Sequence, residues 1–243
     1  MRFQSFGIKK SNNVTSILIG FLGNLFFTYC IIVALVLIFF SSVTIECAVV
    51  GESMKPTYNF DIKKGNDIVF VNTKDRDFYF GDIVVVDIEN RSDPIIKRVI
   101  GIGGDIIDVV VGNDDKYHLE VNGQIIEETY INLEYNENKL KYKDDFTGMR
   151  ECRDNFDSLQ LSHPNLFITE GRNAGKVLVP DGCVFVLGDN RHNSQDSTHY
   201  GVFSEEQIRG TVERELMAGD SKFAFYWSYV VRGEFFETIA NCF

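Results

Sequence analysis

Residues 95–102 read Ile-Ile-Lys-Arg-Val-Ile-Gly-Ile, a largely β-branched run that follows Pro94. Runs of this length and composition are typical of β-strands. Similar runs recur at short spacing, separated by turn residues. They cover Ile68–Val71, Ile83–Asp87, Ile106–Val110, Leu119–Ile126, Lys176–Val179 and Cys183–Leu187. The run Leu119–Ile126 carries Asn122-Gly123, the usual sequence at the tip of a β-hairpin. The spacing predicts a mainly β domain built on an antiparallel sheet, because βαβ units would need helical segments between the strands.

The stretch 127–177 differs from its surroundings, since it is polar and only weakly periodic. We expect it to form an elaboration of the β core, with Leu166–Thr169 as one further strand. Ser204–Ile208 has a Ser cap and an acidic first turn, which predicts the start of a helix. We therefore expect a β-rich core formed by residues 47–108 and 178–243. Residues 109–177 would be inserted into this core as a subdomain of strands and loops.

The N-terminal region is strongly apolar, with no charged residue between Lys10 and Glu46. A spanning helix needs about 20 apolar residues, so we expect one transmembrane anchor at 17–46. A cleaved signal peptide would have a shorter apolar region and a better cleavage site than Ala48 offers.

Charges around the apolar segment predict its orientation. Arg2, Lys9 and Lys10 precede it, whereas Glu46 and Glu52 follow it. The positive-inside rule therefore places a cytoplasmic tail at 1–16 and the following domain outside the cytoplasm, as in a single-pass protein of the inner or plasma membrane.

Composition narrows the possible partners. The chain has 35 acidic and 24 basic residues and a net charge of −11, which argues against nucleic acid. Contact with the lipid bilayer must then be hydrophobic. No Cys-x-x-Cys pair and no histidines at ligand spacing occur, so no metal site is predicted. Pairing of Cys152 with Cys183 stays open, as does the oligomeric state.

A candidate site begins just after the apolar segment, at Gly51-Glu52-Ser53-Met54-Lys55-Pro56-Thr57. Serine is a poor nucleophile until a base takes its proton. Lys97 is a candidate base, because alternation along its strand turns either Lys97 or Arg98 toward the interior or a cleft. A desolvated lysine has a lowered pKa and can accept a proton near neutral pH. The alternative is an ordinary surface Lys-Arg pair on an edge strand.

Histidine is the usual partner of a catalytic serine, and a Ser-His pair remains a second alternative. The chain has four histidines, and His192 and His199 flank a polar run that begins at Gly188. His118 and His163 lie in no convincing catalytic setting.

Four segments, in this order behind an apolar N-terminal segment, resemble the conserved boxes of bacterial type I signal peptidases. They are Gly51–Thr57, Phe80–Val85, Ile96–Asp105 and Phe185–Ser197. The resemblance covers residues 48–108 and 178–212 and says little about 109–177.

The resemblance implies that Ser53 is the nucleophile and Lys97 the general base. Ser194 would hydrogen-bond and orient the lysine ammonium, and Asp196 would support that arrangement. With Gly51 two positions before the nucleophile, the oxyanion hole would rest on backbone N–H groups, including that of Ser53. The remaining implied roles are structural support by Asp189, Arg191 and Arg98, and substrate contact by Met54 and Pro56. Two departures are Thr198, where many members carry an arginine that pairs with the acidic residue, and Gly103 in place of a common proline.

The implied activity is that of a membrane-anchored serine endopeptidase, which removes signal peptides from exported preproteins after small residues. The substrate would bind as an added β-strand, and no cofactor would be needed. One alternative is a dedicated peptidase of a conjugation or pilus system, and another is a catalytically inactive homologue acting as a membrane-bound binding module. Soluble self-cleaving repressors share the Ser-Lys design, but the predicted anchor argues against them. Phe223–Trp227 could form either an apolar face at the membrane interface or an ordinary core strand.

Overall fold

The computed structural model describes residues 14–59, 65–131 and 149–216. The chain divides into two compact units, Met1–Val43 and Thr44–Phe243. The segment Phe223–Trp227 lies outside the described residues, so its two interpretations stay predictions.

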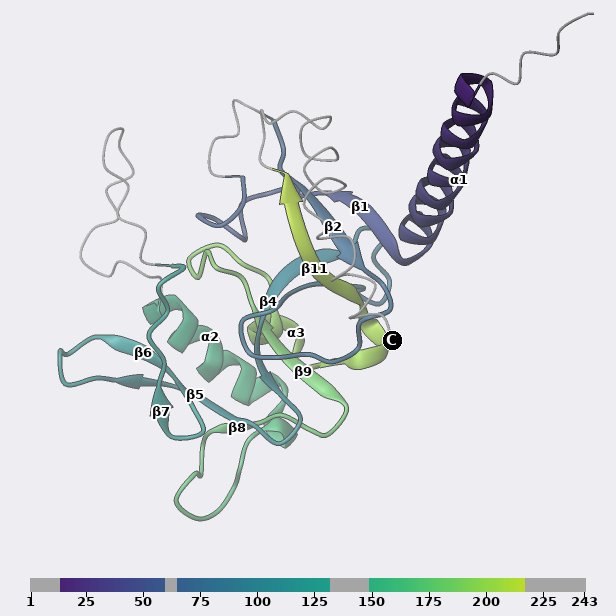
Figure 1. Cartoon of the computed structure of the whole chain (residues 1–243). Helices are drawn as coiled ribbons and strands as arrows, with labels where there is room; N and C mark the ends of the chain where they lie inside the picture. Colours follow the sequence, from purple (N-terminus) through teal and green to yellow (C-terminus); the bar gives the residue numbers. More distant parts are fainter. Residues whose placement is uncertain (1–13, 60–64, 132–148, 217–243) are drawn as a thin grey trace, which may run out of the picture. The chain divides into compact units, whose positions relative to one another are not determined.

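The first unit contains one long helix, α1, Val14–Val43 (Figure 1). Its segment Ile17–Leu35 is long and apolar enough to cross a membrane. Large apolar side chains such as Phe26 and Leu35 are more than half exposed, as expected of a helix that has no protein core around it.

The second unit is built on a seven-stranded sheet in which every neighbouring pair is antiparallel. Its strand order is β1-β2-β11-β3-β4-β9-β10. The strands are β1 Thr44–Ala48, β2 Ile68–Asn72, β3 Ile83–Val86, β4 Ile95–Ile102, β9 Cys183–Leu187, β10 Phe203–Ser204 and β11 Ile208–Leu216. The prediction of a mainly antiparallel β fold behind an apolar N-terminal helix is confirmed.

The apolar segment gives way to the sheet earlier than predicted. We expected the anchor to reach residue 46, but α1 ends at Val43 and residues 44–46 begin β1. This strand pairs with β2 from Thr44↔Asn72 to Ala48↔Ile68 in antiparallel register. Hydropathy alone could not separate the helix from the strand, because Val43, Thr44 and Ile45 continue the uncharged run.

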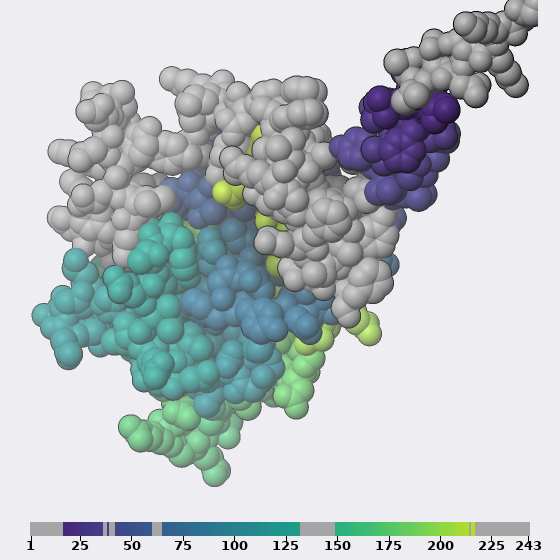
Figure 2. Space-filling view, viewed as in Figure 1, coloured from purple at the N-terminus to yellow at the C-terminus, as the bar shows by residue number. Residues whose placement is uncertain are grey.

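A smaller sheet of four strands, in the order β7-β6-β5-β8, extends from the turn after β4. Helix α2, Met149–Ser162, packs against β5 and β6 and also contacts the short helix α3, Ser197–Tyr200 (Figure 1). In the space-filling view the teal atoms of the smaller sheet adjoin the blue atoms of residues 65–100 (Figure 2). The strands of this sheet are β5 Ile106–Val111, β6 Tyr117–Val121, β7 Gln124–Ile125 and β8 Val177–Leu178.

Helix α2 was not predicted, although the sequence carries a signal for it. Its buried residues Met149, Cys152, Phe156 and Leu159 recur at intervals of three and four, which is helical spacing. The nine polar residues between and after them masked this pattern within the polar stretch 127–177.

Two smaller predictions about secondary structure were wrong. The strand expected at Leu166–Thr169 is a 3₁₀ turn, Pro164–Leu166, followed by a single bridge from Phe167 to Val177. The helix expected from Ser204 is limited to one 3₁₀ turn, Glu205–Gln207, because Ile208 then pairs with Val86 in the sheet.

The core beneath the two sheets is continuous around β4 and β9. Ile100 and Phe185 from these strands lie in one buried cluster with Ile107, Leu119 and Phe156. β4 is thus a strand of the seven-stranded sheet that also contributes to this core, and Lys97 and Arg98 are its third and fourth residues.

Candidate active site

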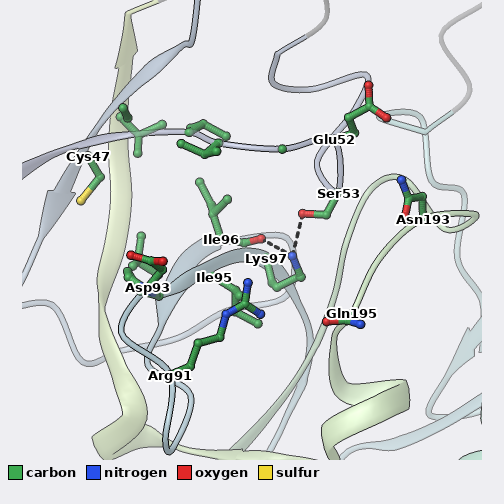
Figure 3. A pocket seen from close by; sticks show the side chains of 17 residues that line it. Cys47, Glu52, Ser53, Arg91, Asp93, Ile95, Ile96, Lys97, Asn193 and Gln195 are labelled. Carbon is green, nitrogen blue, oxygen red and sulfur yellow. Dashed lines mark hydrogen bonds between the residues drawn. The ribbon is translucent and has the colours of Figure 1, made fainter.

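Ser53 and Lys97 meet at the edge of a cleft in the second unit. Lys97 Nζ donates to Ser53 Oγ over 2.7 Å and to the carbonyl oxygen of Ile96 over 2.8 Å (Figure 3). Ser53 comes from the turn after β1, whereas Lys97 lies on β4 opposite Val84. The fold thus brings together two side chains that are 44 residues apart in the sequence.

Burial sets the electrostatics of Lys97, which is only 2% exposed. Desolvation lowers the pKa of its ammonium to about 8, and the nearby Arg91 adds to this effect. The carboxylates of Asp196 and Asp189 oppose it by favouring the charged form. A lysine with this pKa is largely protonated at neutral pH but holds an accessible neutral form.

The next residue, Arg98, points to the opposite face of β4 and is also buried. Its Nε and Nη2 donate to the two carboxylate oxygens of Asp189 over 2.8 and 2.6 Å, and Nη1 donates to Gly81 O. Asp189 also accepts a short hydrogen bond from Thr57 Oγ1. The alternation of the strand predicts that one of the two adjacent cations faces the interior or a cleft, and in the structure both side chains are buried, on opposite faces of β4.

The loop after β9 holds the backbone around Ser53. The N–H of Asn190 donates to Ser53 O over 2.9 Å, and its side-chain Nδ2 donates to Glu52 O over 3.1 Å. Gly188 must be glycine for steric reasons, because a Cβ there would lie 2.2 Å from Ser194 Oγ and 2.5 Å from Ser53 O. The serine turn and this loop are therefore in close backbone contact.

Ser194 and Asp196 lie near the pair, but with contacts other than those expected. Ser194 Oγ is buried and has no hydrogen-bond partner among the described residues, so the expected bond to Lys97 is absent. Ser194 Oγ packs against Gly188, in the space that a Cβ of that residue would need. Lys97 Nζ donates instead to Ser53 Oγ and to the carbonyl oxygen of Ile96. Asp196 accepts the N–H of Gly188 over 2.9 Å.

Thr198, which replaces a common arginine, supports Asp196 directly. Its backbone N–H and its Oγ1 both donate to Asp196 Oδ1, over 3.1 and 2.8 Å. Arg191, in turn, forms a buried bidentate ion pair with Glu128, and its Nε donates to Gly188 O over 3.1 Å. Burial opposes the charged form of Arg191, but Glu128 more than compensates and raises the pKa of the guanidinium.

The cleft beside the pair has a volume of about 570 Å³. One side is formed by residues 47–53, which run from the end of β1 into the turn that carries Ser53, and another by Pro94–Lys97, with Arg91 and Asp93 from the preceding loop (Figure 3). Val69 from β2, Val85 from β3, and Asn193 and Gln195 from the loop after β9 complete the lining. Gly51 lies in this lining with φ of +93°, a conformation that glycine adopts without strain.

Met54 and Pro56 are not among the residues that line the cleft. Met54 is 1% exposed and packs with Tyr58, Val69 and Val85 in the core beneath it. Substrate contact by these two residues stays a prediction, which their placement does not favour.

The histidines have partners other than Ser53. His199 contacts Thr198 Oγ1, His192 pairs with Glu151, His163 contacts Ser162 Oγ, and His118 contacts Asp114. The geometry therefore favours lysine over histidine as the partner of Ser53. Cys152 and Cys183 are both free thiols in this structure.

Comparison with known proteins identifies the family. A family model described as "Signal peptidase, peptidase S26" matches residues 22–217. The chain belongs to this family. The resemblance to type I signal peptidases that the four motifs indicated is thus confirmed, and the chain is a serine endopeptidase by class.

Relatives within the family include signal peptidases of Bacillus and Staphylococcus species. Signal peptidase I of Bacillus caldolyticus is 33% identical over 192 residues, covering 77% of this chain and 85% of the relative. Signal peptidase IB of Staphylococcus aureus is 36% identical over 166 residues, covering 67% and 72%. A solved signal peptidase I from Enterococcus faecalis covers 56% of this chain and 97% of its own, with 25% identity and a TM-score of 0.35.

Several side chains around the site were not singled out from the sequence. Thr57 lies in the motif of Ser53, and Asn190 lies in the motif of Asp189. Membership of these motifs was the sequence signal that could have identified both residues. Glu128 and Tyr130 lie in the polar stretch outside every motif, and no spacing pattern pointed to them.

Proposed function

We propose that this chain is a membrane-anchored signal peptidase that cleaves exported preproteins with Ser53 as nucleophile and Lys97 as general base. The observation that carries the proposal is the 2.7 Å contact between Lys97 Nζ and Ser53 Oγ beside an open cleft. Membership of the signal peptidase family supports the assignment of the substrate class.

The chemistry follows from the protonation state of the lysine. Once Lys97 is neutral, the same short separation lets the Ser53 hydroxyl donate to its lone pair. Ser53 Oγ then attacks the scissile carbonyl carbon while its proton passes to Lys97. The lysine returns that proton to the leaving amine, and water attacks the acyl-enzyme ester with Lys97 again as base.

Two features of the cleft suit an extended peptide. The backbone N–H of Ser53 is one proposed donor to the developing oxyanion, and the other donors would also be backbone N–H groups. The end of β1, the edge strand of the seven-stranded sheet, lies along one side of the cleft, and we propose that a substrate strand pairs near this edge, with small residues next to the cut. The preprotein is thus the proposed partner.

The proposed anchor is α1, inserted in the inner or plasma membrane with the N-terminus in the cytoplasm. Its span Ile17–Leu35 supports insertion, and the basic residues Arg2, Lys9 and Lys10 support that orientation. The lipid bilayer is then the second partner, and catalysis takes place on the outer side.

The test uses the full-length protein in detergent with a preprotein that carries a signal peptide. We expect one cut after a small residue, read by N-terminal sequencing of the product. Product should be abolished by Ser53→Ala, which removes the nucleophile, and by Lys97→Ala, which removes the base. Lys97→Arg should also be inactive, because guanidinium stays protonated at any workable pH. Lys116→Ala, in the exposed turn before β6, is the matched lysine control and should cleave normally.

Turnover by Ser53→Ala would refute the serine mechanism. Absence of product with the unaltered protein would favour the inactive-homologue alternative. Rescue of a bacterial strain depleted of its general signal peptidase would separate a general enzyme from a dedicated one.

A further inference from the structure

Glu128 occupies an unusual position for an acidic residue in the polar stretch after β7. It is 5% exposed, and its carboxylate forms a bidentate ion pair with the guanidinium of Arg191, whose side chain is 1% exposed. A buried ion pair of this kind is costly to break, because removal of one partner leaves the other charge without compensation.

Tyr130, two residues further on, connects the same carboxylate to the second buried arginine. Its Oη donates to Glu128 Oε1 over 2.5 Å. Its ring lies over the guanidinium of Arg98, with 4.0 Å from Cζ to the ring centroid. This distance is well within the range of a cation–π interaction.

The two arginines hold the two halves of the candidate site. Arg98 follows Lys97 on β4 and binds Asp189 with two hydrogen bonds. Arg191 donates to Gly188 O, and Gly188 lies directly against Ser53 O and Ser194 Oγ. Glu128 and Tyr130 thus contact both arginines from a segment that belongs to neither half.

We propose that Glu128 and Tyr130 are positioning residues, which fix the geometry between the Gly188–Arg191 loop, Ser53 and Lys97. The proposal deepens the proposed function and rests on it where turnover is concerned. Neither side chain lines the cleft, so each acts through an arginine and not on the substrate. The inserted segment 109–177 would then contribute to the geometry of the active site, although none of the four motifs includes it.

The physical reason is the fate of Arg191 when its partner is lost. Arg191 stays charged at any workable pH, so without Glu128 it must find water or another carboxylate. Movement of the guanidinium withdraws the hydrogen bond to Gly188 O. The Gly188–Arg191 loop then loses one of the hydrogen bonds that fix its position. This loop holds the backbone of Glu52 and Ser53 through Asn190, so the serine turn should become less ordered.

The experiment compares Glu128→Gln, Tyr130→Phe and Tyr130→Leu with the unaltered full-length protein in detergent. Glu128→Gln keeps the shape of the side chain, and Tyr130→Phe removes only the hydroxyl. Glu127→Gln is the matched control, since Glu127 is the exposed neighbour of Glu128. Three quantities are measured: kcat per titrated active site, KM, and hydrogen exchange of the segments around Gly188 and Ser53.

We expect Glu128→Gln to lower kcat about 10–100-fold, as small displacements of reacting groups do, while KM changes less than about threefold. Tyr130→Leu should lower kcat more than Tyr130→Phe, because only the former removes the ring over Arg98. Exchange around Gly188 and Ser53 should become faster in Glu128→Gln and stay unchanged in Glu127→Gln.

Two results would overturn the proposal: unchanged exchange around Gly188 and Ser53, or a kcat per folded site within about twofold of the unaltered protein. A purely structural role would lower the melting temperature without changing kcat per site. An unaltered protein that does not cleave preprotein would sink the proposed function, and the exchange measurement would still decide whether Glu128 fixes the loop. Should Glu128→Gln fail to fold, Tyr130→Phe and Tyr130→Leu carry the same comparison.

Discussion

Lys97 is buried against the face of a sheet and yet keeps a pKa within reach of neutral pH. Burial lowers that pKa to about 8, while the carboxylates of Asp196 and Asp189 prevent a larger fall. The surrounding charges thus set the fraction of neutral lysine that is available as a base. Arg91, which lines the cleft, shifts the balance toward the neutral form.

The pH profile should follow from this balance. Because the neutral lysine is the proposed base, kcat/KM should rise with pH below about 8 and level off above it. An unperturbed lysine would instead place that limb near 10.4. Arg91→Gln removes a positive charge and should move the limb to higher pH, because the protonated form becomes less unfavourable.

The measurement is kcat/KM for a short peptide substrate between pH 6 and 10, with buffers of constant ionic strength. A limb of the unaltered protein near pH 10 would contradict the lowered pKa. A limb that moves downward in Arg91→Gln would contradict the electrostatic role of Arg91.

Ser194 shows how a single contact departs from the arrangement implied by resemblance. Its hydroxyl is buried beside Gly188 and unbonded among the described residues, whereas Lys97 bonds to the carbonyl of Ile96. The ordering of the lysine in this structure therefore rests on the β4 backbone.

Among the secondary-structure elements, the connection from β1 to Ser53 is held by a buried hydrogen-bond clip. Asn59 Nδ2 donates to Val49 O over 2.7 Å and to Gly51 O over 3.0 Å. Asn59 and Asp67 also exchange hydrogen bonds between the side chain of each and the backbone N–H of the other. The clip fixes the carbonyls of the segment that lines the cleft.

Loss of the Asn59 side chain should weaken both the fold and the cleft. Asn59→Gly keeps the backbone at its φ of +54° but leaves buried carbonyl groups without donors. We expect the free energy of unfolding to fall by about 1–3 kcal/mol, measured by urea denaturation. Asn90→Gly, at an exposed position with φ of +64°, is the matched control and should change it by less than about 0.5 kcal/mol.

Equal stability of the two glycine variants would show that the Asn59 clip contributes nothing beyond its backbone conformation. A drop confined to Asn59→Gly would assign the stabilisation to the side-chain amide.

For the chain as a whole, the boundary between the two units predicts where the N-terminal segment can be removed. The second unit begins at Thr44, and residues 44–46 form three of the five register pairs between β1 and β2. Ile45 also packs against the cluster that contains Met54 and Val71. A cut at Cys47, which the sequence alone suggests, would remove these contacts.

We expect residues 44–243 to be more stable than residues 47–243 by about 1–2 kcal/mol, because full burial of a large apolar side chain contributes about 1.5–3 kcal/mol and Ile45 is partly buried. Thermal and urea unfolding of the two purified chains would measure the difference. Both should float with lipid vesicles less than the full-length chain does, because they lack α1. Identical unfolding curves would show that residues 44–46 do not contribute to the sheet in solution.

The sequence was sufficient for features that depend on short-range patterns. Alternating and β-branched runs predicted the strands from Ile68 to Leu187, and the uncharged N-terminal run predicted the apolar helix. Four ordered motifs identified the family and selected Ser53 and Lys97 from all the serines and lysines of the chain. Each of these signals lies within a few residues, where the local period of the backbone governs which side chains are apolar.

Tertiary structure alone decided which distant groups meet. The pairing of Glu128 with Arg191, 63 residues apart, leaves no local pattern, because a glutamate in a polar stretch is usually solvated. The same holds for the exchange of hydrogen bonds by Asn59 and for the beginning of β1 within an uncharged run. Burial of charges depends on which partners the fold supplies, and that information is spread over the packing of the entire second unit.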